Sequence, residues 1–391
     1  MTEARGAGAK GVLKAFPYPG SISLPLASRQ PKVGIRKGRL VSRGETLATT
    51  ANPAQGIPDL VAPLPGNIAR ISSTHVTLEV DLDIGLQARA LDFSTMSPTE
   101  ARDSLLRLGI RPPRAPRPGE PVFISGFDPE PGVRLAGALL GDQRGVLEAG
   151  IRLVLALFPG KAIVQALPPG PPQLGFPGSQ TVRRKISYPH TLPAFLKWRL
   201  EKDAPFDRLA SGVVGLRQLW LLGRAWSTGL PPLARPLSIQ GVPSLVPPGM
   251  SPLELLSLVN LTPRDGDRIV LGGLARGFCA WDPSLGLGQD QAAVCLVRGG
   301  GKSPPPRACR LCGRCQEACP LRLPVHVLGS APMSGWHMVL AEHRDLATCP
   351  ACGLCALACP SRLPLCALRG VPAPVPPVLT LVKGRDIPPV R

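Results

Sequence analysis

Residues 307–320 read RACRLCGRCQEACP, and residues 349–360 read CPACGLCALACP. In both segments four cysteines follow the spacing C-x2-C-x2-C-x3-C, and a proline comes directly after the fourth. The two segments together hold eight of the eleven cysteines in a chain of 391 residues. Cysteines that repeat with one fixed spacing indicate that thiolates bind metal in this part of the chain.

This spacing is that of the bacterial ferredoxin run C-x2-C-x2-C-x3-C-P, which binds [4Fe–4S] clusters. The first three cysteines of such a run hold one cluster, and in two-cluster ferredoxins the fourth cysteine ligates the other cluster. We therefore expect two [4Fe–4S] clusters with crossed ligands. The first would be held by Cys309, Cys312, Cys315 and Cys359, and the second by Cys349, Cys352, Cys355 and Cys319.

Zinc is the alternative metal, because two C-x2-C pairs form a site of four thiolates. A zinc ribbon needs two pairs rather than two runs of four that end in Cys-Pro, so the sequence favours iron–sulfur clusters. Gly313 and Gly353 occupy the same position in the two runs, where a residue without a side chain lets the backbone approach a cluster. The other cysteines, Cys279, Cys295 and Cys366, are expected to be small buried residues.

The chain is strongly basic, with 45 Lys and Arg against 26 Asp and Glu and a net charge of +19. Such a charge attracts anionic partners. The cations are scattered and are not interleaved with aromatic residues, which argues against a nucleic-acid partner. The best apolar run, 153–158, falls far short of the roughly 18–20 residues of a membrane span. The start of the chain lacks the pattern of a secretory signal, so we expect a cytosolic chain with reduced thiols.

Changes in composition and periodicity divide the chain into four folded parts and a Pro-rich tail. Short apolar runs such as 32–35 and 76–80 predict β structure first. Alternating strands and helices then predict a parallel sheet, and short strands around a helix over 252–259, capped by Ser251, predict a small third domain. The cysteines lie in the fourth part. The expected boundaries are 1–85, 95–235, 236–298, 305–370 and 371–391.

The second part carries the clearest local signals. Helical spacing over 99–108, with Ser97 or Thr99 as a possible cap, predicts a helix. The run 121–126 predicts a buried strand that ends at glycine. A second helix over 146–158 and a second strand over 161–165 follow. The order strand, helix, strand favours parallel pairing.

Several further motifs precede the cysteines. The stretches FPYPG (16–20), VGIRKG (33–38) and VAPLPGNI (61–68) are followed much later by residues 237–261 and by IVLGGLARG (269–277). In this order, and with the cysteine runs behind them, they resemble the RnfC family of the Rnf electron transport complex, a relative of the NADH- and FMN-binding subunit of respiratory complex I. The resemblance implies a multidomain α+β fold: an N-terminal β barrel-sandwich, a Rossmann-like α/β middle domain, a ubiquitin-like SLBB domain and an α-helical two-cluster ferredoxin domain.

The stretch ISGFDPEP (124–131) resembles the nucleotide-site loop of that family, which implies Gly126, Asp128 and Glu130 as nucleotide-binding residues. Family members that oxidise NADH also carry a glycine-rich flavin loop, and the matching stretch here, 108–119, reads LGIRPPRAPRPG. Proline has no N–H to donate to a phosphate. These residues therefore favour a chain that binds neither FMN nor NADH, with bound FMN as the alternative.

The expected function is that of an electron-transfer subunit within a membrane-associated, ion-translocating Rnf-type oxidoreductase. The resemblance implies other Rnf-type membrane subunits as partners, together with an electron carrier such as a ferredoxin, a cytochrome or NADH. It also implies a peripheral position on the cytoplasmic face of the inner membrane. Two alternatives stay open: an NADH-oxidising FMN subunit of the same complex, and a non-catalytic scaffold with structural clusters. No catalytic residue is predicted.

Overall fold

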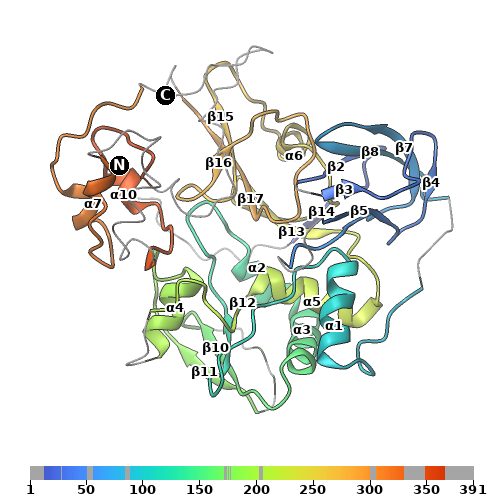
Figure 1. Cartoon of the computed structure of the whole chain (residues 1–391), viewed down its shortest axis with the longest axis horizontal. Coiled ribbons are helices and arrows are strands. Elements are labelled where there is room, and N and C mark those ends of the chain that lie inside the picture. Colours follow the sequence, from blue (N-terminus) through green and yellow to red (C-terminus); the bar gives the residue numbers. More distant parts are fainter. Residues whose placement is uncertain are drawn as a thin grey trace.

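The protein is a mixed α/β chain with several sheets (Figure 1). None of the helices in the described part of the chain combines the length and apolar character needed to cross a bilayer. The expected tail, 371–391, and Cys366 lie outside the described residues. The computed structural model describes residues 13–27, 29–50, 56–83, 89–170, 174, 176, 178–201, 206–299, 305–329 and 348–365.

The middle part is built on a four-stranded sheet in the order β11-β10-β9-β12. Its strands are β9 (Val122–Ser125), β10 (Ile163–Leu167), β11 (Gln180–Arg183) and β12 (Val213–Gly215). Every neighbouring pair in this sheet is parallel, which confirms the pairing predicted from the order of elements.

One face of this sheet is covered by α1 (Pro98–Arg107), α3 (Arg144–Leu157) and α5 (Leu216–Thr228), which lie side by side (Figure 1). α3 and α5 touch through two glycines. A Cβ on Gly150 would lie 2.2 Å from a carbonyl oxygen of α5, and a Cβ on Gly223 would lie 1.8 Å from one of α3. Any larger residue would force these two helices apart.

The opposite face carries α4 (Pro193–Leu200). Successive side chains of a strand point to opposite faces of a sheet. Val122 and Ile124 accordingly pack into the core beneath α3 and α5, whereas Phe123 packs toward α4 with Val213. The sheet is therefore buried on both faces, as is usual for parallel sheets.

The N-terminal part forms two small antiparallel sheets around one apolar core that includes Ile22, Leu47 and Leu78. The run 32–35, predicted as a strand, is instead a turn, in which Val33 is 98% exposed. One sheet contains β2 (Ser21–Pro25), β8 (His75–Val80), β7 (Gly66–Ile71) and β4 (Leu40–Val41). The other contains β3 (Arg29–Pro31), β5 (Thr46–Thr50) and β6 (Leu60–Val61).

The third part is a six-stranded mixed sheet that packs on α6 (Pro252–Ser257). Its edge strand β1 comes from the beginning of the chain, so the sheet is not built from 236–298 alone. The strands are, in sheet order, β1 (Lys14–Ala15), β14 (Val242–Val246), β13 (Arg235–Ile239), β17 (Ala293–Val297), β15 (Arg268–Leu271) and β16 (Phe278–Cys279).

The cysteine-rich part contains the short helices α7 (Arg314–Glu317), α8 (His326–Gly329) and α10 (Leu354–Ala358). In Figure 1 it lies at one side of the molecule, beyond α4 and the β15–β16 hairpin. A small apolar core of its own joins cysteine and leucine side chains from both cysteine runs.

Candidate metal centre

The two cysteine runs fold into nearly identical loops. Leu311 and Ala351 adopt positive φ angles of 53° and 55°, and Gly313 and Gly353, which cap α7 and α10, have φ angles of 73° and 80°. Residues other than glycine rarely adopt this left-handed conformation. Each loop thus turns sharply on both sides of its second cysteine.

Backbone amides within these loops point at sulfur. The N–H of Leu311 donates a hydrogen bond to Cys309 Sγ at 3.4 Å, and the N–H of Ala351 donates to Cys349 Sγ at the same distance. Such bonds stabilise negative charge on a thiolate and help set the potential of a cluster bound to it.

Cys359, the last cysteine of the second run, lies with the first run. One small hollow is lined by Cys309, Cys312, Cys315 and Cys359, together with His326. Burial raises the pKa of the Cys315 thiol, and the nearby Cys359 and Cys309 sulfurs raise it further. The chain thus brings together the four cysteines expected for the first cluster.

Cys319, the last cysteine of the first run, lies with the second run in the same way. Burial raises the pKa of the Cys352 thiol, and the nearby Cys349 and Cys319 sulfurs raise it further. Cys355 belongs to the apolar core of this part of the chain, which contains cysteines of both runs. Cys319 thus lies near two cysteines of the second run, and the crossed pairing itself stays a prediction.

The two groups of cysteines differ in their exposure to solvent. Cys319, Cys352 and Cys355 of the second group are buried. In the first group Cys312 is exposed, and its neighbour Leu311 is 69% exposed. The first group therefore has an open edge, whereas the second group is enclosed.

The second group is enclosed because the rest of the protein covers it. The hydroxyl of Tyr188 donates a hydrogen bond to the Cys352 carbonyl, and the side chain of Phe195 on α4 belongs to the same buried cluster as Cys352. The β15–β16 hairpin of the third part packs directly against Gly353, where an added Cβ would lie 2.2 Å from the Ala275 oxygen. The second group thus lies where three parts of the chain meet.

The donor atoms suit a cluster better than a single ion. Within the described ranges, no three His, Cys, Asp or Glu side chains converge closely enough to hold one metal ion. In a [4Fe–4S] cluster each cysteine binds a different iron atom, so the sulfurs stand farther apart. Two sets of four thiols, with N–H groups directed at sulfur and an apolar surround, fit such a group.

Two of the three residues implied as a nucleotide site have structural roles in the loop after β9. Gly126 packs closely on β10: a Cβ there would lie 2.5 Å from the end of the Leu167 side chain and 3.1 Å from the Ala166 oxygen. Asp128 Oδ1 accepts the N–H groups of Leu135 and Ala136 at 2.7 and 2.8 Å. It thereby satisfies amides at the start of α2 (Ala136–Asp142). Burial raises the pKa of Asp128.

The third residue, Glu130, fastens the middle part to the third. Its Oε2 accepts the N–H of Arg276 at 3.0 Å, and the N–H groups of Gly273 and Ala275 also bond to its carboxylate. Burial raises the pKa of Glu130, and the nearby Arg276 opposes that shift. The carboxylates of both implied nucleotide residues are thus bonded to backbone amides of the chain itself.

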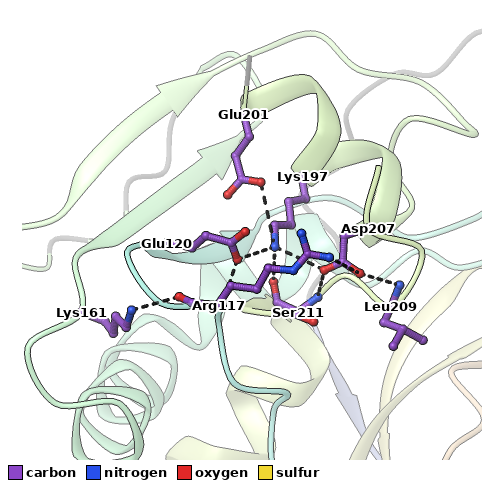
Figure 2. Close-up of polar contacts among 8 residues, drawn as sticks. All are labelled: Arg117, Glu120, Lys161, Lys197, Glu201, Asp207, Leu209 and Ser211. Atoms are coloured by element: carbon purple, nitrogen blue, oxygen red, sulfur yellow. Dashed lines mark hydrogen bonds and ion pairs between the residues drawn. The ribbon is translucent and has the colours of Figure 1, made fainter. Parts of the chain in front are cut away.

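A buried lysine that the sequence did not single out lies on α4. Lys197 is 2% exposed, and its ammonium donates to Glu120 Oε2 at 2.7 Å, to Asp207 Oδ2 at 3.3 Å and to the Ser211 oxygen at 2.9 Å (Figure 2). Glu201 lies 3.9 Å away. The lysine's three N–H donors thus all have acceptors.

This network has the position of a structural brace. Burial alone would raise the pKa of Glu120 and of Asp207. Hydrogen bonds to the two carboxylates, including those from Lys197, have the larger combined effect, so both pKa values are lowered. Glu120 and Ser211 come just before β9 and β12, at the amino ends of these parallel strands. Ligands of such sheets bind at the carboxyl ends, so we assign Lys197 the task of holding α4 to the sheet. A lysine within the apolar run PAFLKW is the one sequence signal that marks it.

Comparison with known proteins places the chain in no family. No protein-family model matches it, and no curated protein matches it. Among solved structures, a chain of an NAD+-reducing [NiFe]-hydrogenase in the air-oxidized state is similar, with 12% identity and a TM-score of 0.37. The similarity covers 58% of this chain and 48% of that chain, so this protein spans about half the length of that structure. A likeness this slight does not define a function.

Proposed function

We propose that this protein relays single electrons through two [4Fe–4S] clusters, held by Cys309, Cys312, Cys315 and Cys359 and by Cys349, Cys352, Cys355 and Cys319. The observation that carries the proposal is that Cys359 lines one hollow with the first three cysteines of the first run, while Cys319 lies near Cys352 of the second run. When bound, such a cluster takes up and releases one electron at a time. The chain supplies thiolate ligands, N–H groups directed at sulfur, and an apolar surround that excludes water.

The difference in solvent exposure between the two cysteine groups indicates which cluster exchanges electrons with an external carrier. The open edge at Cys312 and Leu311 is where an external carrier comes within reach, whereas the second group faces the rest of the chain. Arg310 and Arg314, on either side of Cys312, are exposed and add positive charge to that edge. A carrier with an acidic docking face would be steered toward it.

The place of this relay in an Rnf-type complex is part of the proposal and rests on the motifs of the sequence. In it, the N-terminal β part corresponds to the barrel-sandwich domain, the parallel sheet to the Rossmann-like domain and the six-stranded sheet to the SLBB domain. The partners are the membrane subunits of such a complex and an electron carrier, with the chain peripheral at the cytoplasmic face of the inner membrane. In this proposal FMN and NADH bind elsewhere in the complex. Two observations support this part of the proposal: prolines interrupt residues 108–119, and the carboxylates of Asp128 and Glu130 are already bonded to backbone amides of the chain.

Alanine variants test the crossed pairing. Electron paramagnetic resonance spectra of the reduced protein would be compared for Cys312→Ala, Cys352→Ala, Cys359→Ala and Cys319→Ala. Crossed ligands predict that the Cys359 variant loses the same signal as the Cys312 variant, and the Cys319 variant the same signal as the Cys352 variant. The opposite matching would refute the pairing. Cys295→Ala, which lies outside both runs, is the matched control and is expected to keep both signals.

The absence of a flavin site is tested separately. The anaerobically purified protein would be mixed with NADH while the visible absorption of the clusters is followed. We expect no bleaching with NADH and full bleaching with dithionite. Rapid bleaching by NADH together with stoichiometric FMN would show that the chain is an NADH-oxidising subunit.

A further inference from the structure

A cavity of about 620 Å³ lies where the N-terminal β part, the third part and the helices of the middle part meet, and none of its lining residues belongs to the two cysteine runs. Its size falls within the range of about 300–1,000 Å³ that is typical of small-ligand pockets. Most of its wall is apolar and comes from all three parts, with Leu24, Val61, Leu221 and Trp281 among the lining residues.

Four arginines line this cavity: Arg29, Arg111, Arg217 and Arg235. Of these Arg235 is buried and Arg217 is partly buried. Arg217 donates from Nε to the Pro236 oxygen at 3.0 Å and from Nη2 to the Gln289 carbonyl. Arg235, 2% exposed, donates to carbonyls of residues 287 and 288. A guanidinium has five N–H donors. Among the described residues the Nε of Arg235, which is fully buried, has no acceptor.

These two cations have little negative charge beside them. Burial lowers the pKa of Arg217 to about 10, and burial together with repulsion from Arg217 lowers the pKa of Arg235 to about 9. Asp290 offsets only part of this effect. Its side chain is 76% exposed and is shared with Arg111 at 3.7 Å. Both guanidiniums therefore stay charged at neutral pH, with neutral carbonyls as their bonded partners.

We propose that this cavity binds a small amphipathic anion, whose carboxylate or phosphate head lies on Arg217 and Arg235 and whose apolar body lies along the leucine and proline wall. A buried charge is costly unless a counter-charge reaches it, and a guanidinium presents its donors in the planar geometry that carboxylates and phosphates accept. The apolar wall excludes water and so strengthens that pairing. This site is separate from the clusters and does not depend on the proposed electron relay.

Calorimetric titration of the intact, cluster-containing protein with four probes tests the proposal. The probes are dodecanoate, dodecyl phosphate, dodecanol and inorganic phosphate, each below its micelle concentration. We expect one site that binds dodecanoate or dodecyl phosphate at least about tenfold more tightly than dodecanol or inorganic phosphate. The tighter of the two anions identifies the head as a carboxylate or a phosphate. Equal binding of dodecanol, or no saturable binding of either amphiphilic anion, overturns the proposal.

Three variants locate the site. Arg217→Gln should weaken binding of the anion by about ten- to a hundredfold, the loss typical of a hydrogen bond to a charged group, and leave dodecanol unchanged. Ala234→Phe narrows the cavity without removing a charge and should abolish binding, which keeps the test valid if the arginine variant fails to fold. Arg268→Gln alters a half-buried arginine that does not line the cavity and should have no effect. Unchanged affinity in the first two variants would refute the assignment.

Discussion

Lys197→Met removes the ammonium group from the middle of the network in Figure 2 and keeps the apolar stem of the side chain. The change leaves the Glu120 carboxylate without its closest cation and removes one of the donors to Asp207. The side chains of Lys197 and Asp207 are only 2% and 6% exposed, so water does not readily replace the lost partner.

The expected loss of stability depends on the partners that each carboxylate keeps in the variant. Removing one member of a fully buried ion pair destabilises a protein by about 3–5 kcal/mol. Here Asp207 keeps the N–H groups of Ser211 and Leu209 and has Arg117 at 3.8 Å, and Glu120 is 19% exposed. These features reduce the expected loss to about 2–4 kcal/mol.

The sign of the pH dependence is specific to this network. In the native protein the pKa values of Glu120 and Asp207 are lowered, so their stabilising contribution is present above their ordinary pKa and is lost as the pH falls through the lowered values. Without the ammonium, burial raises these pKa values, and the charged carboxylates then oppose folding at neutral pH. The difference in stability between native protein and variant should therefore be largest near pH 7 and shrink toward about pH 4.

Amide hydrogen exchange measures this loss where it occurs. Protection of β9 and β12 at pH 7 should fall by about 30- to 700-fold in Lys197→Met, as a change of about 2–4 kcal/mol requires. Lys161→Met is the control, because the bond from its ammonium to the Arg117 oxygen is exposed and the loss of that bond should change stability by no more than about 0.5 kcal/mol. Unchanged protection in the lysine 197 variant, or a difference that grows toward pH 4, would show that the network does not brace the sheet.

Two further substitutions test the surroundings of the cysteines. Gly353→Ala should lose most of the second group's iron, because its Cβ would lie 2.2 Å from the Ala275 oxygen. In the control Gly313→Ala the added Cβ meets nothing within 4 Å, so this variant should keep its iron and lose only about 1 kcal/mol through backbone strain. Equal iron content of the two variants by metal analysis would contradict this prediction. Glu130→Ala should increase hydrogen exchange of Gly273, Ala275 and Arg276, whose N–H groups bond to the Glu130 carboxylate. The control Glu148→Ala, which removes an exposed ion pair with Arg144, should not increase it. Unaltered exchange in the first variant would show that Glu130 does not hold the two parts together.

Local signals in the sequence predicted the elements that depend on neighbouring residues. Ser97 caps α1 and forms a capping box with Glu100, and Ser251 does the same with Glu254 at the start of α6. Both caps act within one helical turn, so the residues that form them are visible in a short window. The strands over 121–126 and 161–165 were predicted for the same reason, because their apolar runs are continuous.

Contacts between distant residues could not be predicted in this way. Lys197 and Glu120 are 77 residues apart, and nothing in either local sequence marks them as partners. The cavity requires Arg217 and Arg235 to meet a loop at 287–289, whose bonded residues lie 72 and 53 positions farther along the chain. The motif around Asp128 and Glu130 resembled a nucleotide loop, but their bonds to backbone amides depend on the tertiary fold. The cysteine spacing is the exception, because its repeat carries long-range pairing information in the sequence itself.

The most direct test of the relay is the metal content of the anaerobically purified chain. Two [4Fe–4S] clusters predict about eight iron atoms and about eight acid-labile sulfides per chain. Reduction by dithionite should bleach the visible absorption and produce paramagnetic signals from both clusters. Stoichiometric zinc without labile sulfide would contradict the account, because the eight thiolates would then hold ions that carry no electrons.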